Sequence, residues 1–259
     1  GHAQRHRAPA IFFLTTRQKK GTERMKHFAS TTAGLLALLA LAASCDDGRL
    51  YADRLILPEE GRVVRLTATL DGLDTWADGY SVVLAGFGEG SDYAVIAKSV
   101  QAADDGTVDI TMSGVAEEVT TLEVCAINRI RKRVATYYEL DCSTLSDDTL
   151  RIDAGRLDVG MFATIQQDIF DRTCTGCHGE GRWLDLSAGA SHATLVGQPS
   201  TVFEGRTRVL PGHAAESVLY TILTTDESAN LATDHQTQFT LSDEQFALIE
   251  DWIDGGAGE

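Results

Sequence analysis

Basic side chains are scarce in most of this chain. Of its 22 lysines and arginines, seven lie in residues 1–44, where Glu23 is the single acid. Residues 45–259 therefore carry 15 basic and 37 acidic side chains, a net charge of −22. Such a surface repels nucleic acid and anionic lipid headgroups and favours basic partners. We expect no nucleic-acid partner; a second interpretation is that the acidity mainly keeps the protein in solution.

Residues 50–157 lack familiar catalytic patterns. They contain no Ser-His-Asp arrangement, no carboxylates grouped with histidine and no phosphate-binding loop. They contain instead seven runs of alternating apolar and polar residues, bounded by turn pairs such as Asp71-Gly72 and Asp105-Gly106. The runs are residues 63–70, 80–87, 93–96, 107–112, 121–127, 134–140 and 150–152. This pattern predicts an all-β, antiparallel sandwich of immunoglobulin-like type over residues 45–158, and a spacer, docking or sugar-binding role fits it equally.

Two further features of this β region leave alternatives open. Arg129, Arg131, Lys132 and Arg133 form the only basic patch after residue 44, either a solvated hairpin tip or a surface for an acidic partner or a lipid headgroup. Cys125 and Cys142 suggest a disulfide in an oxidising compartment. A hairpin that turns near residue 131, however, would not place these two cysteines opposite one another.

The start of the chain resembles a bacterial lipoprotein leader. Met25 is the first methionine, and residues 25–44 combine a short polar start with an uncharged, leucine- and alanine-rich run. Small residues then precede Cys45, the predicted site of lipidation, and residues 1–24 are interpreted as an upstream extension. The alternative is an uncleaved transmembrane anchor, for which the run is a little short. Both interpretations place the rest of the chain in the cell envelope, facing the periplasm and held to the membrane.

The most specific pattern is the pentapeptide Cys174-Thr175-Gly176-Cys177-His178. Two cysteines three apart with a histidine directly after the second are typical of covalent haem c attachment. Each thiol adds to one porphyrin vinyl group, and the histidine binds the iron as an axial ligand. Zinc binding would usually need a second ligand pair, and a thioredoxin-type redox pair would need a βαβ context; the sequence contains neither.

Residues 159–259 change to a helical period. Phe162, Ile165, Ile169 and Phe170 predict one face of a helix that ends near Thr173 and leads to Cys174. Another helix is expected to start after Pro211-Gly212 and to carry Val218, Leu219 and Ile222. Ser242 and Gln245 form a capping box for a last helix that ends at Gly255-Gly256.

The order of short motifs in this part resembles bacterial monohaem cytochrome c domains, of the kind found fused to other modules in planctomycetes. The matching stretches are residues 174–179, 184–186, 210–212, 217–220, 241–244 and 252–257. The resemblance implies a small all-α domain with one covalent haem c and a role in electron transfer. Trp183, Leu184, Leu186, Leu210 and Tyr220 are expected to wall the haem pocket.

The chain departs from the family at the second axial ligand. Such domains usually place a Met-Pro pair shortly before the final Leu-Ser-Asp-Glu, but no methionine follows Met161. His235 stands near the expected place and is the predicted ligand. His213, His192, Met161 or no side chain at all are the alternatives. Two imidazoles would lower the potential relative to His/Met ligation, whereas an open site would admit peroxide or a diatomic gas.

These expectations favour a membrane-anchored electron carrier that exchanges single electrons with redox proteins of the envelope, rather than an enzyme. One alternative is a haem peroxidase or an electron-feeding subunit of an envelope oxidoreductase, although only one haem motif is present. Another is a glycan- or protein-binding lipoprotein in which the cytochrome domain is accessory.

Overall fold

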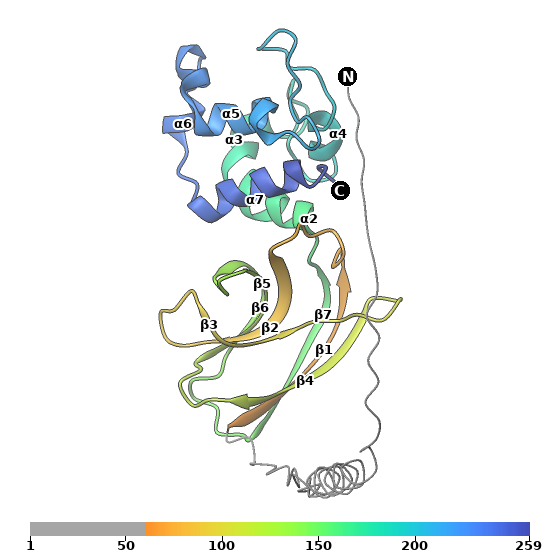
Figure 1. The fold of residues 1–259 in the computed structure, drawn as a ribbon, viewed down its shortest axis with the longest axis vertical. Helices are drawn as coiled ribbons and strands as arrows, with labels where there is room; N and C mark the ends of the chain where they lie inside the picture. The colour runs from red at the N-terminus through yellow and green to blue at the C-terminus, as the bar shows by residue number, and fades with distance from the viewer. Residues whose placement is uncertain (1–60) are drawn as a thin grey trace, which may run out of the picture. The chain divides into compact units, whose positions relative to one another are not determined.

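The computed structural model describes residues 61–259. The predicted upstream extension (1–24), signal peptide (25–44) and lipidation site at Cys45 lie outside the described residues. Within the described part, a seven-strand β region is followed by a small helical region (Figure 1). None of the helices between residues 61 and 259 has the length and apolar character needed to cross a membrane.

The strands form two sheets, with orders β4-β1-β7 and β3-β2-β5-β6. Their bounds are β1 Arg62–Asp71, β2 Tyr80–Phe87, β3 Ala94–Ser99, β4 Thr107–Val115, β5 Thr121–Asn128, β6 Arg133–Asp141 and β7 Thr149–Asp158. Each predicted run is a strand, but the expectation of a purely antiparallel sandwich is wrong. β1 and β7 pair in parallel, a pairing that needs a long connection, and the five intervening strands supply it. Alternation in the sequence carries no information on strand direction.

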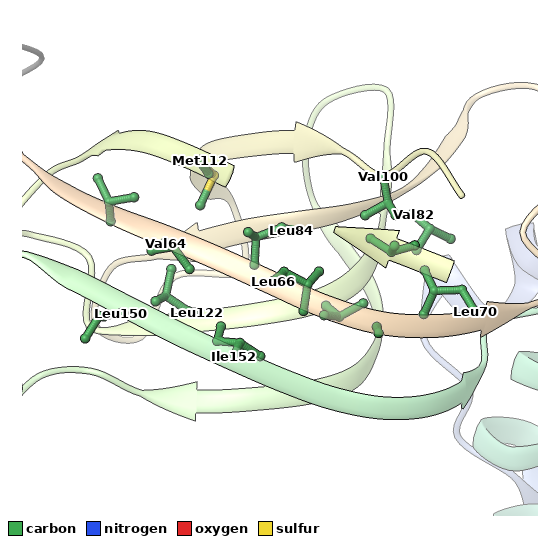
Figure 2. Close-up of a cluster of buried hydrophobic side chains, with 14 of the residues drawn as sticks. Val64, Leu66, Leu70, Val82, Leu84, Val100, Met112, Leu122, Leu150 and Ile152 are labelled. Atoms are coloured by element: carbon green, nitrogen blue, oxygen red, sulfur yellow. The ribbon is translucent and has the colours of Figure 1, made fainter. Parts of the chain in front are cut away.

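The two sheets share a core made by every second residue of the strands. Val64, Leu66 and Leu70 of β1 point to the same side, and Leu84 and Leu122 from the other sheet meet them (Figure 2). The period of two seen in the sequence thus corresponds to one buried face of each sheet.

The four-stranded sheet also buries side chains on its other face. The amide of Ala94 donates to the carbonyl of Arg131 (3.0 Å) and the amide of Arg133 donates to that of Asp92 (2.8 Å), so β3 and β6 meet where they begin. This closure encloses a second apolar cluster that includes Phe87 and Cys125. Cys142 belongs to the core between the sheets, and both thiols are free, so the suggested Cys125–Cys142 disulfide is absent.

Two residues of the basic patch are ion-paired inside the protein. Arg133 pairs with the fully buried carboxylate of Glu123 and also with Asp92 (2.9 Å). Lys132 pairs with Glu244 of the helical region at 2.5 Å. Burying Glu123 without a cation would be costly, so this part of the patch stabilises the fold.

The helical region consists of short elements joined by irregular segments. Their bounds are α2 Met161–Ile165, η1 Gln166–Cys174, α3 Thr175–His178, α4 Ser191–Leu195, η2 Ala214–Glu216, α5 Val218–Thr224, η3 Asp226–Asn230, α6 His235–Gln238 and α7 Asp243–Asp254. The expected first helix exists, but it widens to a π-helix over η1 instead of remaining α-helical. The capping box of Ser242 and Gln245 at α7 is confirmed.

The β region contributes side chains to the core of the helical region. Trp76, Tyr80 and Val134 pack against a cluster that includes Ile249 and Trp252 of α7. The Tyr80 hydroxyl donates to the Asp251 carboxylate (2.6 Å). Together with the Lys132–Glu244 pair, these contacts attach α7 to the β region.

Candidate functional site

The pentapeptide 174–178 forms the end of η1 and the single turn of α3. Its two cysteines are free thiols; Cys174 is partly buried and Cys177 is exposed. Burial, and to a lesser extent the neighbouring Cys177, raise the pKa of the Cys174 thiol to about 11. At neutral pH Cys174 therefore carries its proton, and it is not a preformed thiolate ligand for a metal ion.

The segment after the pentapeptide folds back onto His178. The amide of Leu186 donates to the His178 carbonyl at 2.7 Å. The carboxylate of Asp185 accepts from the amides of Gly181 (3.1 Å) and Ser187 (3.0 Å), which closes the loop between them. The ring of Trp183 then lies edge-on to the imidazole of His178, with centroids 5.6 Å apart.

The side chain of a buried glutamine is hydrogen-bonded to this loop. The amide nitrogen of Gln166 donates to the carbonyl of Leu186 (2.9 Å) and to the carboxylate of Asp171 (2.6 Å), and its oxygen accepts from the buried hydroxyl of Ser191 (2.5 Å). Gln166 lies in the π-helical segment, and such segments are frequent at functional sites. Its side chain fixes the loop that carries Leu184 and Leu186.

Two cavities, of about 370 and 70 Å³, flank the imidazole of His178. They share the lining residues His178, Leu184, Arg208, Val218, Ile222, His235 and Phe239. Cys177 opens into the larger cavity and Cys174 into the smaller one. Apart from the histidines and Arg208, the shared lining is apolar, as expected of a pocket for a large, flat organic group.

Three of the five expected wall residues line these cavities. Trp183 and Leu184 line the larger one, and Leu184 and Leu186 line the smaller one. Leu210 and Tyr220 line neither cavity. The amide of Leu210 is instead bound to the Ser217 hydroxyl (2.8 Å), in the turn before α5.

His178 and His235 lie across the pocket from one another. Their ring centroids are 6.2 Å apart, and the ring planes differ by 24°. Burial, and to a smaller extent the nearby His235, lower the pKa of His178. His178 is therefore neutral at neutral pH, the form that binds metals.

The side-chain orientation of His235 is set by its own loop. Its Nδ1 lies 3.0 Å from the carbonyl of Thr233. A proton on Nδ1 would be donated to this carbonyl and would leave the Nε2 lone pair free to bind a metal. Nδ1 of His178, in contrast, is buried without a hydrogen-bond partner.

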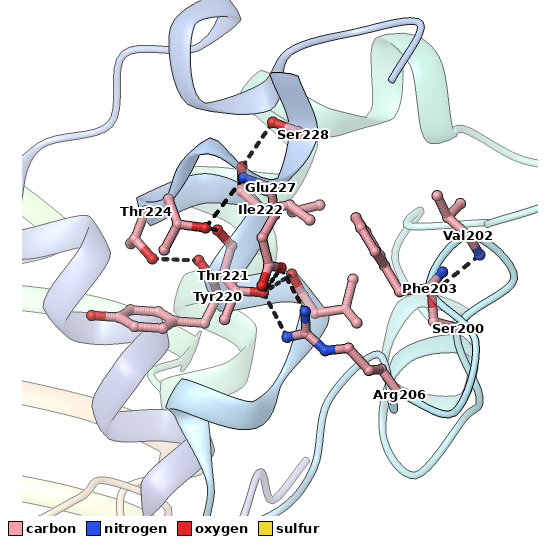
Figure 3. Close-up of polar contacts among 12 residues, drawn as sticks. Ser200, Val202, Phe203, Arg206, Tyr220, Thr221, Ile222, Thr224, Glu227 and Ser228 are labelled. Atoms are coloured by element: carbon pink, nitrogen blue, oxygen red, sulfur yellow. Dashed lines mark hydrogen bonds and ion pairs between the residues drawn. The ribbon is translucent and has the colours of Figure 1, made fainter. Parts of the chain in front are cut away.

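The outer wall of the larger cavity is tied to α5 and η3 by an ion pair. Arg206 binds the Glu227 carboxylate (2.6 Å) and the Thr221 hydroxyl (2.9 Å), and Thr221 also donates to Glu227 (2.6 Å) (Figure 3). The amide of Phe203 donates to the Ser200 hydroxyl (3.0 Å), which shapes the turn that lines the cavity. No sequence pattern indicates this network, because its members come from three separate segments.

The other candidates for a second ligand lie elsewhere. His192 is bound through Nε2 to the Ala257 carbonyl (2.8 Å) and packs edge-on to Phe162. His213 is exposed, 3.7 Å from Glu216. Met161 is buried in the helical core. None of the three lines either cavity, whereas His235 lines both.

Among residues 61–259, no three histidine, cysteine or acidic side chains gather closely enough to hold a metal ion by themselves. A structural zinc site would require such a set, usually of four ligands.

Comparison with known proteins found no match: no protein-family model matches the chain, and no curated protein matches it.

Proposed function

We propose that this chain is a c-type cytochrome that binds one haem covalently and transfers single electrons. The observation that carries the proposal is the His178–His235 pair, which lines two cavities, the larger with Cys177 and the smaller with Cys174 in its wall.

The spacing of the two imidazoles suits one iron between them. Two metal–nitrogen bonds of about 2 Å, plus about 1 Å from each nitrogen to its ring centre, separate the centroids by about 6 Å. The measured centroid separation is 6.2 Å, with the ring planes 24° apart. The cavities on either side, lined by Cys177 and Cys174, are suited to a porphyrin plane that passes between the histidines.

Each residue has a definite role in this proposal. Cys174 and Cys177 hold the group through thioether bonds, the sulfur and the hydrogen of each thiol adding across one vinyl double bond. His178 and His235 would be the protein ligands of the iron, and Leu184, Ile222 and Phe239 would exclude water from it. Arg208, the cation shared by both cavities, would offset the carboxylates of the bound group. The bound haem would supply a one-electron redox couple.

His235 also bears on the choice between a carrier and an enzyme. A haem peroxidase needs an open position on the iron for its substrate, and in this proposal His235 would occupy that position. We therefore propose an electron carrier rather than an enzyme, with a potential below that of a His/Met relative.

The resemblance to bacterial monohaem cytochrome c domains supports the same function and an all-α cytochrome domain for the helical region. The two face-to-face sheets suit an immunoglobulin-like sandwich. We propose that this sandwich carries and supports the cytochrome domain. Lipidation at Cys45 would anchor the protein to a membrane of the cell envelope, facing the periplasm, where its partners would be other redox proteins.

The proposal is tested by optical spectra of the full chain, produced in a host that attaches haem c. Reduced-minus-oxidised spectra of the wild type should show a low-spin c-type haem. His235→Ala should convert the haem to a high-spin form, and the matched control His213→Ala should not. A colourless wild type contradicts the haem assignment, while an unchanged His235→Ala spectrum contradicts only the second ligand.

A further inference from the structure

Ser228, in η3, has a buried hydroxyl next to the backbone of His235. Its Oγ accepts from the backbone amide of His235 (2.9 Å) and lies 3.0 Å from the Asp234 carboxylate and 3.3 Å from the Ile222 carbonyl. Ile222 belongs to α5 and lines both cavities. One hydroxyl thus connects the cavity wall to the residue that faces the cofactor position.

Asp234 fixes the same backbone from the other side. Its carboxylate accepts from the amide of Gln236 (3.2 Å) and the hydroxyl of Thr237 (2.9 Å) as the N-cap of α6. His235 is the first residue of this helix.

The helix that carries His235 is too short to be stable by itself. α6 has only four residues, and helices of this length are unstable without outside support. The support comes from Ser228 and Asp234. Ser228 is in turn fixed because its neighbour Glu227 is bound by Arg206 and Thr221 (Figure 3).

We propose that Ser228 and Asp234 are positioning residues that hold His235 in place as the second axial ligand. This inference rests on the proposed cytochrome function. A chain that lacks a methionine in this loop needs a rigid support for the histidine that replaces it. Loss of either residue should let the imidazole leave the iron for part of the time.

The test compares four variants of the full-length holoprotein. Ser228→Ala and Asp234→Ala remove the two supports. Ser217→Ala is the matched control, because Ser217 is an equally buried serine of the same region, bound to Leu210 and His213 rather than to the His235 loop. Asp234→Asn keeps an oxygen acceptor at the cap and should retain most of the support.

The measurements are the high-spin fraction and the rate at which carbon monoxide binds the ferrous protein. Carbon monoxide can bind only when His235 is off the iron, so the rate reports the open population. Losing these hydrogen bonds should raise this rate about tenfold in both alanine variants and by less than about twofold in the other two. Free imidazole should restore the low-spin spectrum of Ser228→Ala, which an unfolded chain would not show.

The outcomes separate this inference from the function on which it rests. A low-spin wild type with unchanged rates in both alanine variants overturns the positioning role and leaves the cytochrome intact. An equal rise in Ser217→Ala also overturns it, because the effect would then be general loosening. A wild type that is colourless or already high-spin overturns the function or the second ligand, and the positioning role with them.

Discussion

The two regions of this molecule use their apolar residues differently. In the β region, side chains such as Leu66 and Leu84 pack against one another between two sheets. In the helical region, Leu184, Ile222 and Phe239 surround cavities, and the longest helix has 12 residues. The space between the two sheets is filled by the side chains of the β region, whereas the helical region surrounds two cavities beside its own core.

The contacts between the two regions also indicate that they differ in how they are stabilised. The helical core includes Trp76, Tyr80 and Val134 from the β region as partly buried members. A region with short helices and a cavity gains from a rigid neighbour, because the apolar contacts missing inside it are replaced in part at its border. The β region should therefore support the helical region more than the reverse.

The largest effect should follow from removing the predicted attachment points. Replacing both Cys174 and Cys177 by serine should abolish covalent haem and leave the apolar cavity unfilled. Hydrogen exchange resolved by mass spectrometry should then show lost protection across residues 161–254 and little change across residues 62–158. Lost protection in both regions, or in neither, would contradict the proposed difference between the β region and the helical region.

Core truncations test which region depends on the other. Leu84→Ala and Ile249→Ala each remove a fully buried aliphatic side chain and should cost about 2 to 5 kcal/mol. Leu84→Ala should destabilise both regions, whereas Ile249→Ala should lower only the helical transition. Thermal unfolding followed by haem absorbance and by far-ultraviolet circular dichroism distinguishes the two transitions, and equal shifts of both in Ile249→Ala would refute the dependence.

A smaller effect on stability is expected where the β region contacts the helical region. Tyr80→Phe removes the hydrogen bond to Asp251 while keeping the ring, and should lower the free energy of unfolding of the helical region by about 1 kcal/mol. Asp251 raises the pKa of Tyr80 by accepting this bond, although burial is the larger cause. Phe87→Leu, in the enclosed cluster of the four-stranded sheet, is a control that should leave the border contacts unchanged.

The smallest effect concerns pH. Hydrogen bonds from Thr221 and then Arg206 lower the pKa of Glu227 from its ordinary value of 4.5. The stabilisation is thus fully present above that pH and is lost as the pH falls through the lower, folded value. Glu227→Gln should be less stable than the wild type at neutral pH, and acid titration of the helical unfolding midpoint should show the difference shrinking. A difference that grows on acidification would contradict this.

The sequence predicted some parts of this molecule and could not predict others. The strands and α7 follow from local periodicity and capping, and the residues proposed to hold the haem are contiguous in residues 174–178. The parallel β1–β7 pair, the closure of β3 on β6 and the separation of Cys125 from Cys142 depend on contacts between distant strands. His235 was predicted by the missing methionine, but the support from Ser228 depends on how η3 lies against α6.

The central claim is that Cys174 and Cys177 hold one haem covalently. The most direct test is the mass of the chain after denaturation, which strips every group that is not covalently bound. Protein from a host that attaches haem c should retain the mass of one haem per chain, and the Cys174/Cys177 double serine variant should retain none. A wild-type chain whose denatured mass equals that of the polypeptide alone would contradict the claim.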